Sequence, residues 1–164
     1  MKRYIKSVAT SLLDEPLDIQ LEFARTSSDV NQLEQLIDSR AVIKCEVAKN
    51  PNLTEDLIRD LYSSGGFRVE ESLVENPSTP ADVLSNIAET PKTPEIVLRH
   101  IAEHPNTSPD TLKQLADSQY WVVRVKVAKR ADTPIEVLQE LSKDIEIPVK
   151  SVARRTLKSL NANS

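Results

Sequence analysis

A short proline-containing phrase recurs along this chain and constrains its fold more than any other feature. The phrase reads x-P-x-T, and its three clearest copies are Asn76-Pro77-Ser78-Thr79, Thr90-Pro91-Lys92-Thr93 and His104-Pro105-Asn106-Thr107. Apolar residues at helical spacing follow each copy, so the phrase predicts the end of one helix and the beginning of the next. We interpret the chain as a tandem array of short helices.

The composition favours helices separated by prolines over a β fold. The 164 residues include 10 Pro but only 2 Gly, too few for the positive-φ turns of a hairpin-rich sheet. Proline ends helices because it lacks an N–H donor and disfavours helical dihedrals in the residue before it. Aromatic residues make up only 4 % of the chain, so the core must be built from aliphatic side chains. The predicted fold class is all-α.

Five pairs of helices can be aligned after Ser28. Core residues are three apart in the first helix of each pair and four apart in the second, which places each couple on one helical face. The predicted first helices are 30–37, 57–62, 83–88, 112–116 and 137–141, and the second helices are 41–49, 67–75, 94–103, 120–129 and 146–158. The inward couples of the second helices are Ile43/Val47, Val69/Leu73, Val97/Ile101, Val123/Val127 and Pro148/Val152.

The closing positions of the pairs define a period. They recur about every 27 residues, within the range of helical repeats, at Pro51, Pro77, Pro105 and Ala131. Pro91 marks the turn inside one pair. We predict a single repeat domain over residues 1–164, with an N-terminal helical cap at 1–27, about five helix pairs at 28–155 and a C-terminal tail at 156–164. In the cap, Pro16 is expected to separate a helix containing Tyr4, Ile5, Val8, Leu12 and Leu13 from one containing Ile19, Leu21 and Phe23.

Threonine followed by proline predicts how several helices begin. We expect the threonine side chain to be the N-cap and the proline to occupy the first helical position, where a missing N–H costs nothing. The pairs are Thr79-Pro80, Thr93-Pro94 and Thr133-Pro134.

The recurring motif V-A-x-N-P-x-x-T/P, followed by L-x-x-L-A, resembles the leucine-rich repeat variant family of bacterial proteins, and neighbouring HEAT-like families share its logic. Residues 47–51, 73–80, 101–107 and 127–134 carry the resemblance, which covers about residues 28–155. It implies a right-handed α/α superhelix in which an α-helix alternates with a short second helix, often of 3₁₀ type. It also raises an iron–sulfur cluster, but Cys45 is the only cysteine, so we expect the fold and no cofactor.

An outward column on the second helices gives the candidate binding residues. Positions opposite the inward couples are polar except at Phe67 and at Trp121 with Val125, and second helices of such solenoids usually line the concave ligand face. An aromatic anchor within a basic rim is a typical binding site. The alternative is that Phe67 and Trp121 fold back and fill gaps. The candidate residues are Phe67, Trp121, Val125, Lys129, Lys150 and Arg154.

Catalytic and metal sites are not expected. His100 and His104 are spaced as half of a zinc site, but spacing fixes no third ligand. Cys45 has no histidine in its own or an adjacent pair to activate it. With 2 Gly in total, a glycine-rich phosphate loop cannot be assembled.

The sequence therefore predicts a non-catalytic binding or scaffold module that holds a protein or peptide partner. Residues 47–119 contain 6 basic and 12 acidic groups, whereas residues 120–164 contain 9 and 5. That basic end supports an alternative, a nucleic-acid-binding protein similar to HEAT-like DNA glycosylases, although the acidic middle would repel phosphates. A third possibility is a subunit that joins an assembly through an exposed end of the stack. The start of the chain predicts neither a signal peptide nor a membrane span, so we expect a cytoplasmic protein with no membrane partner.

Overall fold

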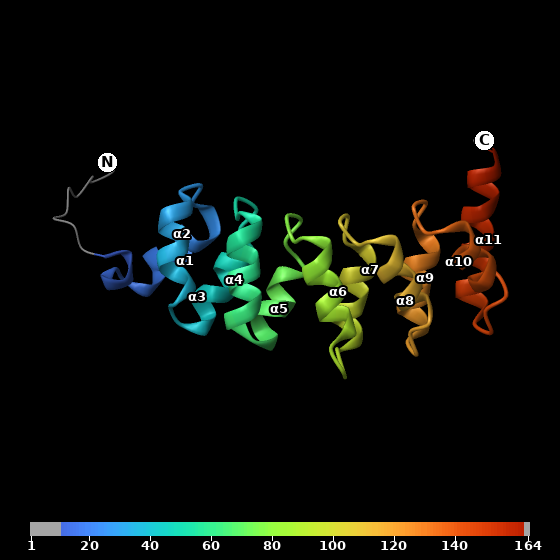
Figure 1. Cartoon of the computed structure of the whole chain (residues 1–164), viewed down its shortest axis with the longest axis horizontal. Coiled ribbons are helices and arrows are strands. Elements are labelled where there is room, and N and C mark those ends of the chain that lie inside the picture. Colours follow the sequence, from blue (N-terminus) through green and yellow to red (C-terminus); the bar gives the residue numbers. More distant parts are fainter. Residues whose placement is uncertain (1–10, 163–164) are drawn as a thin grey trace. The chain divides into compact units, whose positions relative to one another are not determined.

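The computed structural model describes residues 11–162, and this range contains helices and no strand (Figure 1). The all-α prediction is confirmed. None of the helices in this range combines the length and apolarity needed to cross a membrane. The elements are the 3₁₀ helix η1 (Leu12–Asp14) and the α-helices α1 (Leu17–Thr26), α2 (Val30–Ile37), α3 (Ala41–Ala48), α4 (Glu55–Gly65), α5 (Phe67–Leu73), α6 (Ala81–Glu89), α7 (Glu95–Glu103), α8 (Pro109–Ala116), α9 (Trp121–Lys129), α10 (Ile135–Leu141) and α11 (Ile147–Ala162).

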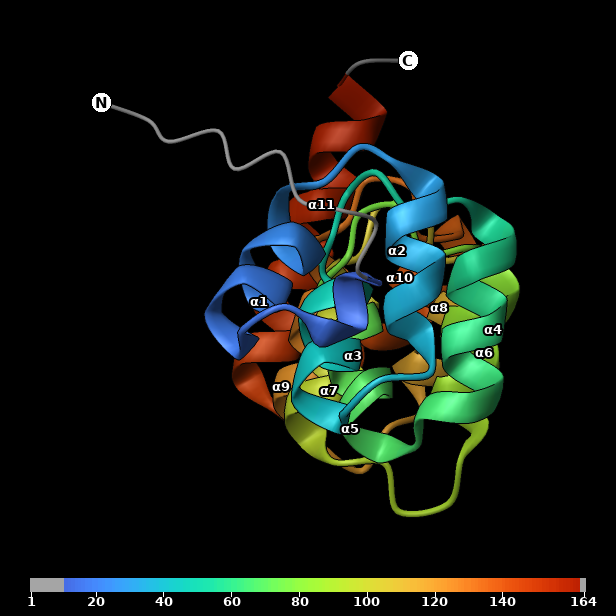
Figure 2. The ribbon, with the colours of Figure 1, turned by 90° about the vertical axis from the view of Figure 1, so that its left-hand side faces the viewer.

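The helices cluster into two compact units, one ending at Ser78 and the other beginning at Thr79. In the N-terminal unit α1, α3 and α5 pack side by side, and α2 and α4 form a second layer. In the C-terminal unit α7, α9 and α11 pack side by side, and α6, α8 and α10 form the second layer (Figure 2). Within each unit we call the odd-numbered helices the B layer and the even-numbered helices the A layer.

The ten helices α2–α11 match the five predicted pairs, and their ends fall close to the predicted ones. All the second helices are α-helices, and none has the 3₁₀ geometry that is frequent in the family this chain resembles. The predicted core couples of the first helices are all nearly inaccessible, with at most 4 % of each residue exposed. These couples are Leu33/Leu36, Ile58/Leu61, Leu84/Ile87, Leu112/Leu115 and Leu138/Leu141.

The described part of the predicted cap contributes a further B-layer helix. Pro16 separates η1 from α1 as expected, and α1 packs against α3 and buries Gln20 and Ala24. Leu12 and Leu13 belong to η1 rather than to a longer helix. The rest of the predicted first cap helix lies outside the described residues.

The threonines before proline do not cap the following helices. The N-cap positions of α7 and α10 are Pro94 and Pro134, without a side-chain cap bond. Thr93 and Thr133 are buried and point backwards: Thr93 Oγ1 donates to the Ile87 carbonyl at 2.9 Å, and Thr133 Oγ1 donates to a carbonyl six residues earlier at 2.7 Å. The last carbonyls of a helix lack intrahelical donors, so these hydroxyls stabilise the preceding helix end.

Buried asparagines join successive B-layer helices of the N-terminal unit. Asn50 is 0 % exposed, and its Nδ2 donates to the carbonyls of Ala24 at 2.9 Å and Ser27 at 3.0 Å. Asn76 repeats this arrangement one pair later, donating to the carbonyls of Ala48 at 2.7 Å and Asn50 at 2.9 Å. Each amide thus supplies donors to the C-terminal end of the previous B-layer helix.

Other side chains fill the equivalent positions in the C-terminal unit. Arg130 Nη1 donates to the carbonyls of Ala102 and His104, and Thr156 Oγ1 donates to the carbonyl of Ala128 at 2.7 Å. We call this set the polar ladder. Its members are Asn50, Asn76, Arg130 and Thr156, and His104 occupies the corresponding sequence position in the remaining pair.

Replacing Lys92 by glycine is expected to stabilise the protein by about 1 kcal/mol. Lys92 is the one non-glycine residue with positive φ, 67°, among residues 11–162, and it follows Pro91 in a turn closed by a 3.3 Å bond from Thr93 N to Thr90 O. A turn with proline at its second position and positive φ at its third favours glycine there. Urea unfolding measures the gain. Lys92→Ala keeps the strained Cβ and should show no gain; equal stabilisation by alanine would contradict this explanation.

Candidate binding surface

Trp121 begins α9 and is accessible. The Ser118 hydroxyl accepts a 3.3 Å hydrogen bond from the backbone N–H of Tyr120, which shapes the turn from which α9 begins. Trp121, the only tryptophan of the chain, is 44 % exposed. It is therefore not a core residue that fills a gap completely, and a large part of its aromatic surface can meet a partner.

The predicted surface stripe lies along α9. Val123 and Val127 are 0 % exposed and fix which side of the helix faces the core. Trp121, Val125 and Lys129 follow one another at every fourth position on the other side, with Val125 half-buried and Lys129 exposed. These three candidate residues are brought together by the helix itself.

The predicted inward couple of α11, Pro148/Val152, is wrong by one residue. Val149 and Ala153 are the fully buried residues of α11, and Pro148 is exposed. Pro148 is the second residue of the helix, where proline is tolerated because the N–H of the first turn has no intrahelical partner. Pro148 suits the backbone of the first helical turn and is not a core residue. Aligning Pro148 with the buried aliphatic residues of the other helices therefore shifted the predicted register of α11 by one residue.

The corrected register changes which α11 residues accompany the α9 stripe. In α11, Val149 and Ala153 correspond to Val123 and Val127 of α9. The number of residues between these two couples equals the number between Arg130 and Thr156 of the polar ladder, so the two helices can be aligned residue by residue. Shifting the α9 stripe by this interval gives the equivalent residues of α11. We call the six residues the α9–α11 surface: Trp121, Val125, Lys129, Ile147, Ser151 and Arg155.

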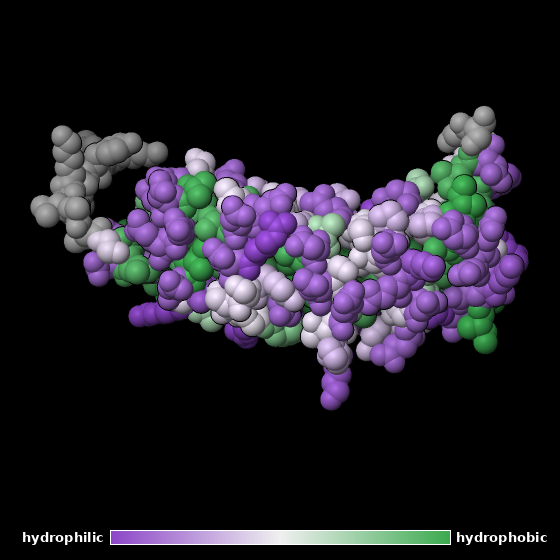
Figure 3. All heavy atoms as spheres, in the orientation of Figure 1, coloured by the Kyte–Doolittle hydropathy of each residue, from purple (hydrophilic) through white to green (hydrophobic). Residues whose placement is uncertain are grey.

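Apolar side chains gather at the helix-start end of the α9–α11 surface. Ile147 is 76 % exposed and Ile145, in the turn before α11, is 87 % exposed. Figure 3 shows hydrophobic surface on the C-terminal unit at the turn between α10 and α11 and along α11. At the other end of this surface lie the exposed cations Lys129, the last residue of α9, and Arg155, in the middle of α11.

The remaining candidates lie elsewhere. Lys150 is half-buried, and its charge contributes to lowering the pKa of the Asp144 carboxyl. Arg154 is exposed, and its Nε donates to the Ser142 carbonyl at 3.1 Å. Phe67 is 48 % exposed at the start of α5 and belongs to the N-terminal unit.

A partly buried ion pair holds the two turns beside the surface. Arg124 binds Asp144 through two bonds, Nε to Oδ2 at 2.7 Å and Nη2 to Oδ1 at 3.0 Å, with side chains 14 % and 8 % exposed. Arg124 Nη1 also donates to the Ser118 carbonyl at 2.8 Å, and Asp144 Oδ1 accepts from the N–H of Glu146 at 2.8 Å. The hydrogen bond from Arg124 holds the pKa of Asp144 below its usual range. The pair thus fixes the turns that precede α9 and α11.

The role of Arg124 could not be found from the sequence. There it is only one of several surface cations near the C-terminal end. Its carboxylate partner, Asp144, lies in the turn before α11 and is too distant in sequence to be recognised by helical spacing.

The charged residues of α9 and α11 are all cations, so any carboxylate that pairs with them belongs to another part of the chain. Neither helix contains an acidic residue. Arg124 and Lys126 of α9 are paired with Asp144 and with Glu103 of α7. Within residues 11–162, no ion pair involves Lys129 or the four cations of α11. These four are Lys150, Arg154, Arg155 and Lys158.

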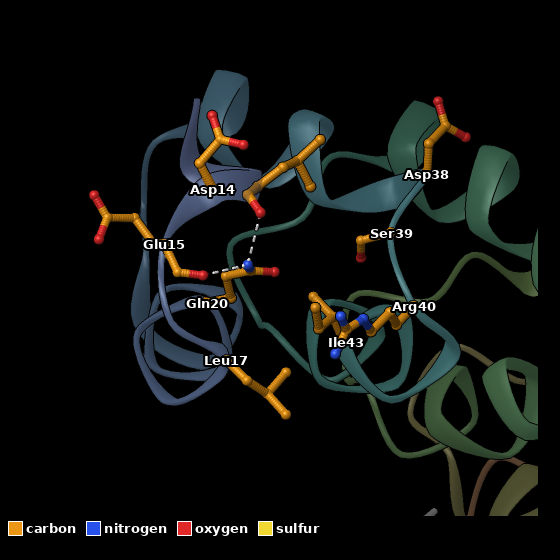
Figure 4. A pocket seen from close by; sticks show the side chains of 9 residues that line it. Asp14, Glu15, Leu17, Gln20, Asp38, Ser39, Arg40 and Ile43 are labelled. Atoms are coloured by element: carbon orange, nitrogen blue, oxygen red, sulfur yellow. Dashed lines mark hydrogen bonds between the residues drawn. The ribbon is translucent and has the colours of Figure 1, made fainter. Parts of the chain in front are cut away.

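An open pocket of about 620 Å³ lies in the N-terminal unit between η1, α1 and the start of α3. Figure 4 shows Gln20 at its wall, where Nε2 donates to the carbonyls of Leu13 at 3.0 Å and Glu15 at 2.6 Å, while the carboxylates of Glu15 and Asp38 point away. The Gln20 amide donor is thus occupied by the backbone. The pocket presents no converging set of polar groups for a ligand.

His104 and Cys45, which the sequence offered as metal and nucleophile candidates, each contact the backbone. Across residues 11–162, no three His, Cys, Asp or Glu side chains come together to hold a metal ion. His104 is 4 % exposed, and its Nδ1 accepts from the N–H of Asn106 at 3.1 Å, as Asn50 Oδ1 accepts from the N–H of Asn52. Cys45 is half-buried with Sγ 3.6 Å from the Arg68 carbonyl oxygen.

Comparison of the chain with the known protein families, with curated proteins and with solved structures found no match, so the resemblance to the leucine-rich repeat variant family stays a prediction.

Proposed function

We propose that this protein is a non-catalytic binding module that holds a peptide segment of a protein partner on the B layer of its C-terminal unit. The observation that carries the proposal is Trp121, a large aromatic side chain that is 44 % exposed at the start of a helix. Tryptophan is enriched among the residues that dominate binding energy at protein interfaces. The ion pair between Arg124 and Asp144 orders the turns around it, so little flexibility is lost on binding.

The scaffold we propose is a right-handed α/α solenoid of the HEAT-like kind, in which the B layer is the ligand face. The polar ladder supports this interpretation, because Asn50, Asn76, Arg130 and Thr156 each bond to the backbone of the preceding B-layer helix. The resemblance of the V-A-x-N-P motif to the leucine-rich repeat variant family supports it as well.

Trp121→Ala should abolish retention of a partner in affinity capture while leaving the free energy of unfolding within about 1 kcal/mol of the unchanged protein. The physical reason is that a half-exposed side chain contributes more to an interface than to the core. Ile135→Ala is the matched control, because Ile135 is 55 % exposed at the start of α10 in the A layer. A large loss of stability in Trp121→Ala without a separable loss of binding would contradict the proposal.

Nucleic-acid binding is the second candidate, and one observation favours it. The four cations of α11 form no ion pair within the described residues, and α11 itself has no acidic residue. A phosphate backbone would neutralise them with release of counterions, so affinity would fall steeply with salt. Titration of duplex DNA at several salt concentrations tests this candidate, and absence of binding at low salt removes it.

A further inference from the structure

We propose that the α9–α11 surface selects an acidic peptide with an apolar anchor, a segment in which a hydrophobic residue is followed at a fixed distance by carboxylates. This inference rests on the proposed function and names the chemistry of its partner. It also replaces Lys150 and Arg154 by Ile147 and Arg155 as binding residues, because the burial of Val149 and Ala153 fixes the register of α11.

The apolar end of the surface supplies the anchor site. Trp121 and Ile147 occupy equivalent first positions of adjacent, packed helices and are 44 % and 76 % exposed. Ile145 lies two residues before Ile147 and is 87 % exposed. Three large apolar side chains left accessible at one end of a helix layer favour a hydrophobic contact.

The cationic end supplies the charge preference. Lys129 ends α9, and Arg155 lies at the equivalent position of α11, one residue before Thr156, which bonds to the end of α9. Two nearby carboxylates form ion pairs with other cations, Glu103 with Lys126 and Asp132 with Arg130. Lys129 and Arg155 therefore face solvent without a counter-charge from the described part of the chain, and an acidic ligand would complement them.

The middle of the surface permits a close approach. Val125 and Ser151 separate the two ends, and neither is bulky or charged. Two helical turns from Trp121 to Lys129 span about 12 Å. An extended peptide crosses that distance in about four residues, and a helical peptide in about eight.

The probes are synthetic peptides with one leucine or phenylalanine followed by glutamates at each of these two spacings, and tryptophan emission is the readout. We expect an anchored acidic peptide to bind and shift the emission of Trp121 to shorter wavelength. Peptides with lysine in place of glutamate, or with serine in place of the anchor, should bind at least about tenfold more weakly.

Charge reversal tests the surface directly. Lys129→Glu/Arg155→Glu should weaken the acidic peptide at least about tenfold and should gain affinity for the lysine peptide. Lys113→Glu, an exposed cation of α8 in the A layer, is the control and should change neither.

Other results would separate the preference for acidic peptides from the more general proposal of a binding module. If Trp121→Ala abolishes peptide binding but charge reversal changes nothing, the acidic preference is wrong and the binding module stands. If neither peptide class binds at about millimolar concentration, the inference is overturned, while partner capture through Trp121 still tests the module. If duplex DNA binds and Arg155→Glu abolishes it while Trp121→Ala does not, both claims give way to nucleic-acid binding.

Discussion

Asn50→Ala should lower the free energy of unfolding of the N-terminal unit by about 3 kcal/mol. Asn50 is 0 % exposed, and its amide donates to the carbonyls of Ala24 and Ser27 at 2.9 and 3.0 Å while its Oδ1 accepts from the N–H of Asn52 at 2.9 Å. Alanine would leave the buried Ala24 carbonyl without this donor and would remove one bond each from the part-buried Ser27 carbonyl and Asn52 N–H. A buried group left without a partner costs about 1–3 kcal/mol. Urea unfolding followed by circular dichroism measures the loss.

Asn52→Ala is the matched control in the same turn. Asn52 is exposed, and its amide also bonds to the Ser27 carbonyl, at 3.3 Å. Water can replace that bond, so we expect a loss of about 0.5 kcal/mol or less. Equal losses for Asn50→Ala and Asn52→Ala would show that the polar ladder does not stabilise the helix layer.

Arg124→Ala should lower the free energy of unfolding by about 3 kcal/mol, because it leaves the Asp144 carboxylate, 8 % exposed, without its cation. The Ser118 carbonyl loses a donor in the same variant. The exposed pair Lys49–Glu75, with side chains 45 % and 45 % exposed, provides the comparison, and Lys49→Ala should cost about 0.5 kcal/mol or less. Similar losses in the two variants would contradict a special role for the Arg124–Asp144 pair.

The same pair predicts a pH dependence. The hydrogen bond from Arg124 lowers the folded-state pKa of Asp144. The stability that the ionised Asp144 carboxylate contributes is therefore fully present above the unfolded-state pKa of about 3.9. That contribution is lost as pH falls through the lowered folded-state pKa. The difference in unfolding free energy between the unchanged protein and Asp144→Asn should therefore be large at neutral pH and shrink in strong acid. A difference that grows on acidification would contradict the assignment.

The proline phrase predicted the helices well because proline and helical periodicity act locally. Pro77 and Pro105 end helices whatever surrounds them, and the apolar spacing on either side of each is fixed by the helix period. The role of Thr93 was less predictable, since a hydroxyl beside a helix start can accept from the next helix or donate to the previous one. Thr93 is buried by packing between the layers, and in this position its hydroxyl donates to the previous helix.

The candidate site was predicted only in part. Trp121, Val125 and Lys129 share one helix, so periodicity was enough to group them. The residues of α11 depended on aligning a helix with proline in its first turn, and only the burial of Val149 and Ala153 places Ile147 and Arg155 beside them. Partners distant in sequence, such as Arg124 and Asp144, leave no periodic pattern.

The fluorescence of Trp121 tests the central claim most directly, because it is the only tryptophan of the chain and lies on the proposed surface. In the free protein we expect emission typical of a partly solvated indole and efficient quenching by iodide, since the residue is 44 % exposed. When a partner binds, the emission should shift to shorter wavelength and the quenching should fall. A partner that binds with unchanged emission and unchanged quenching would show that binding does not involve Trp121.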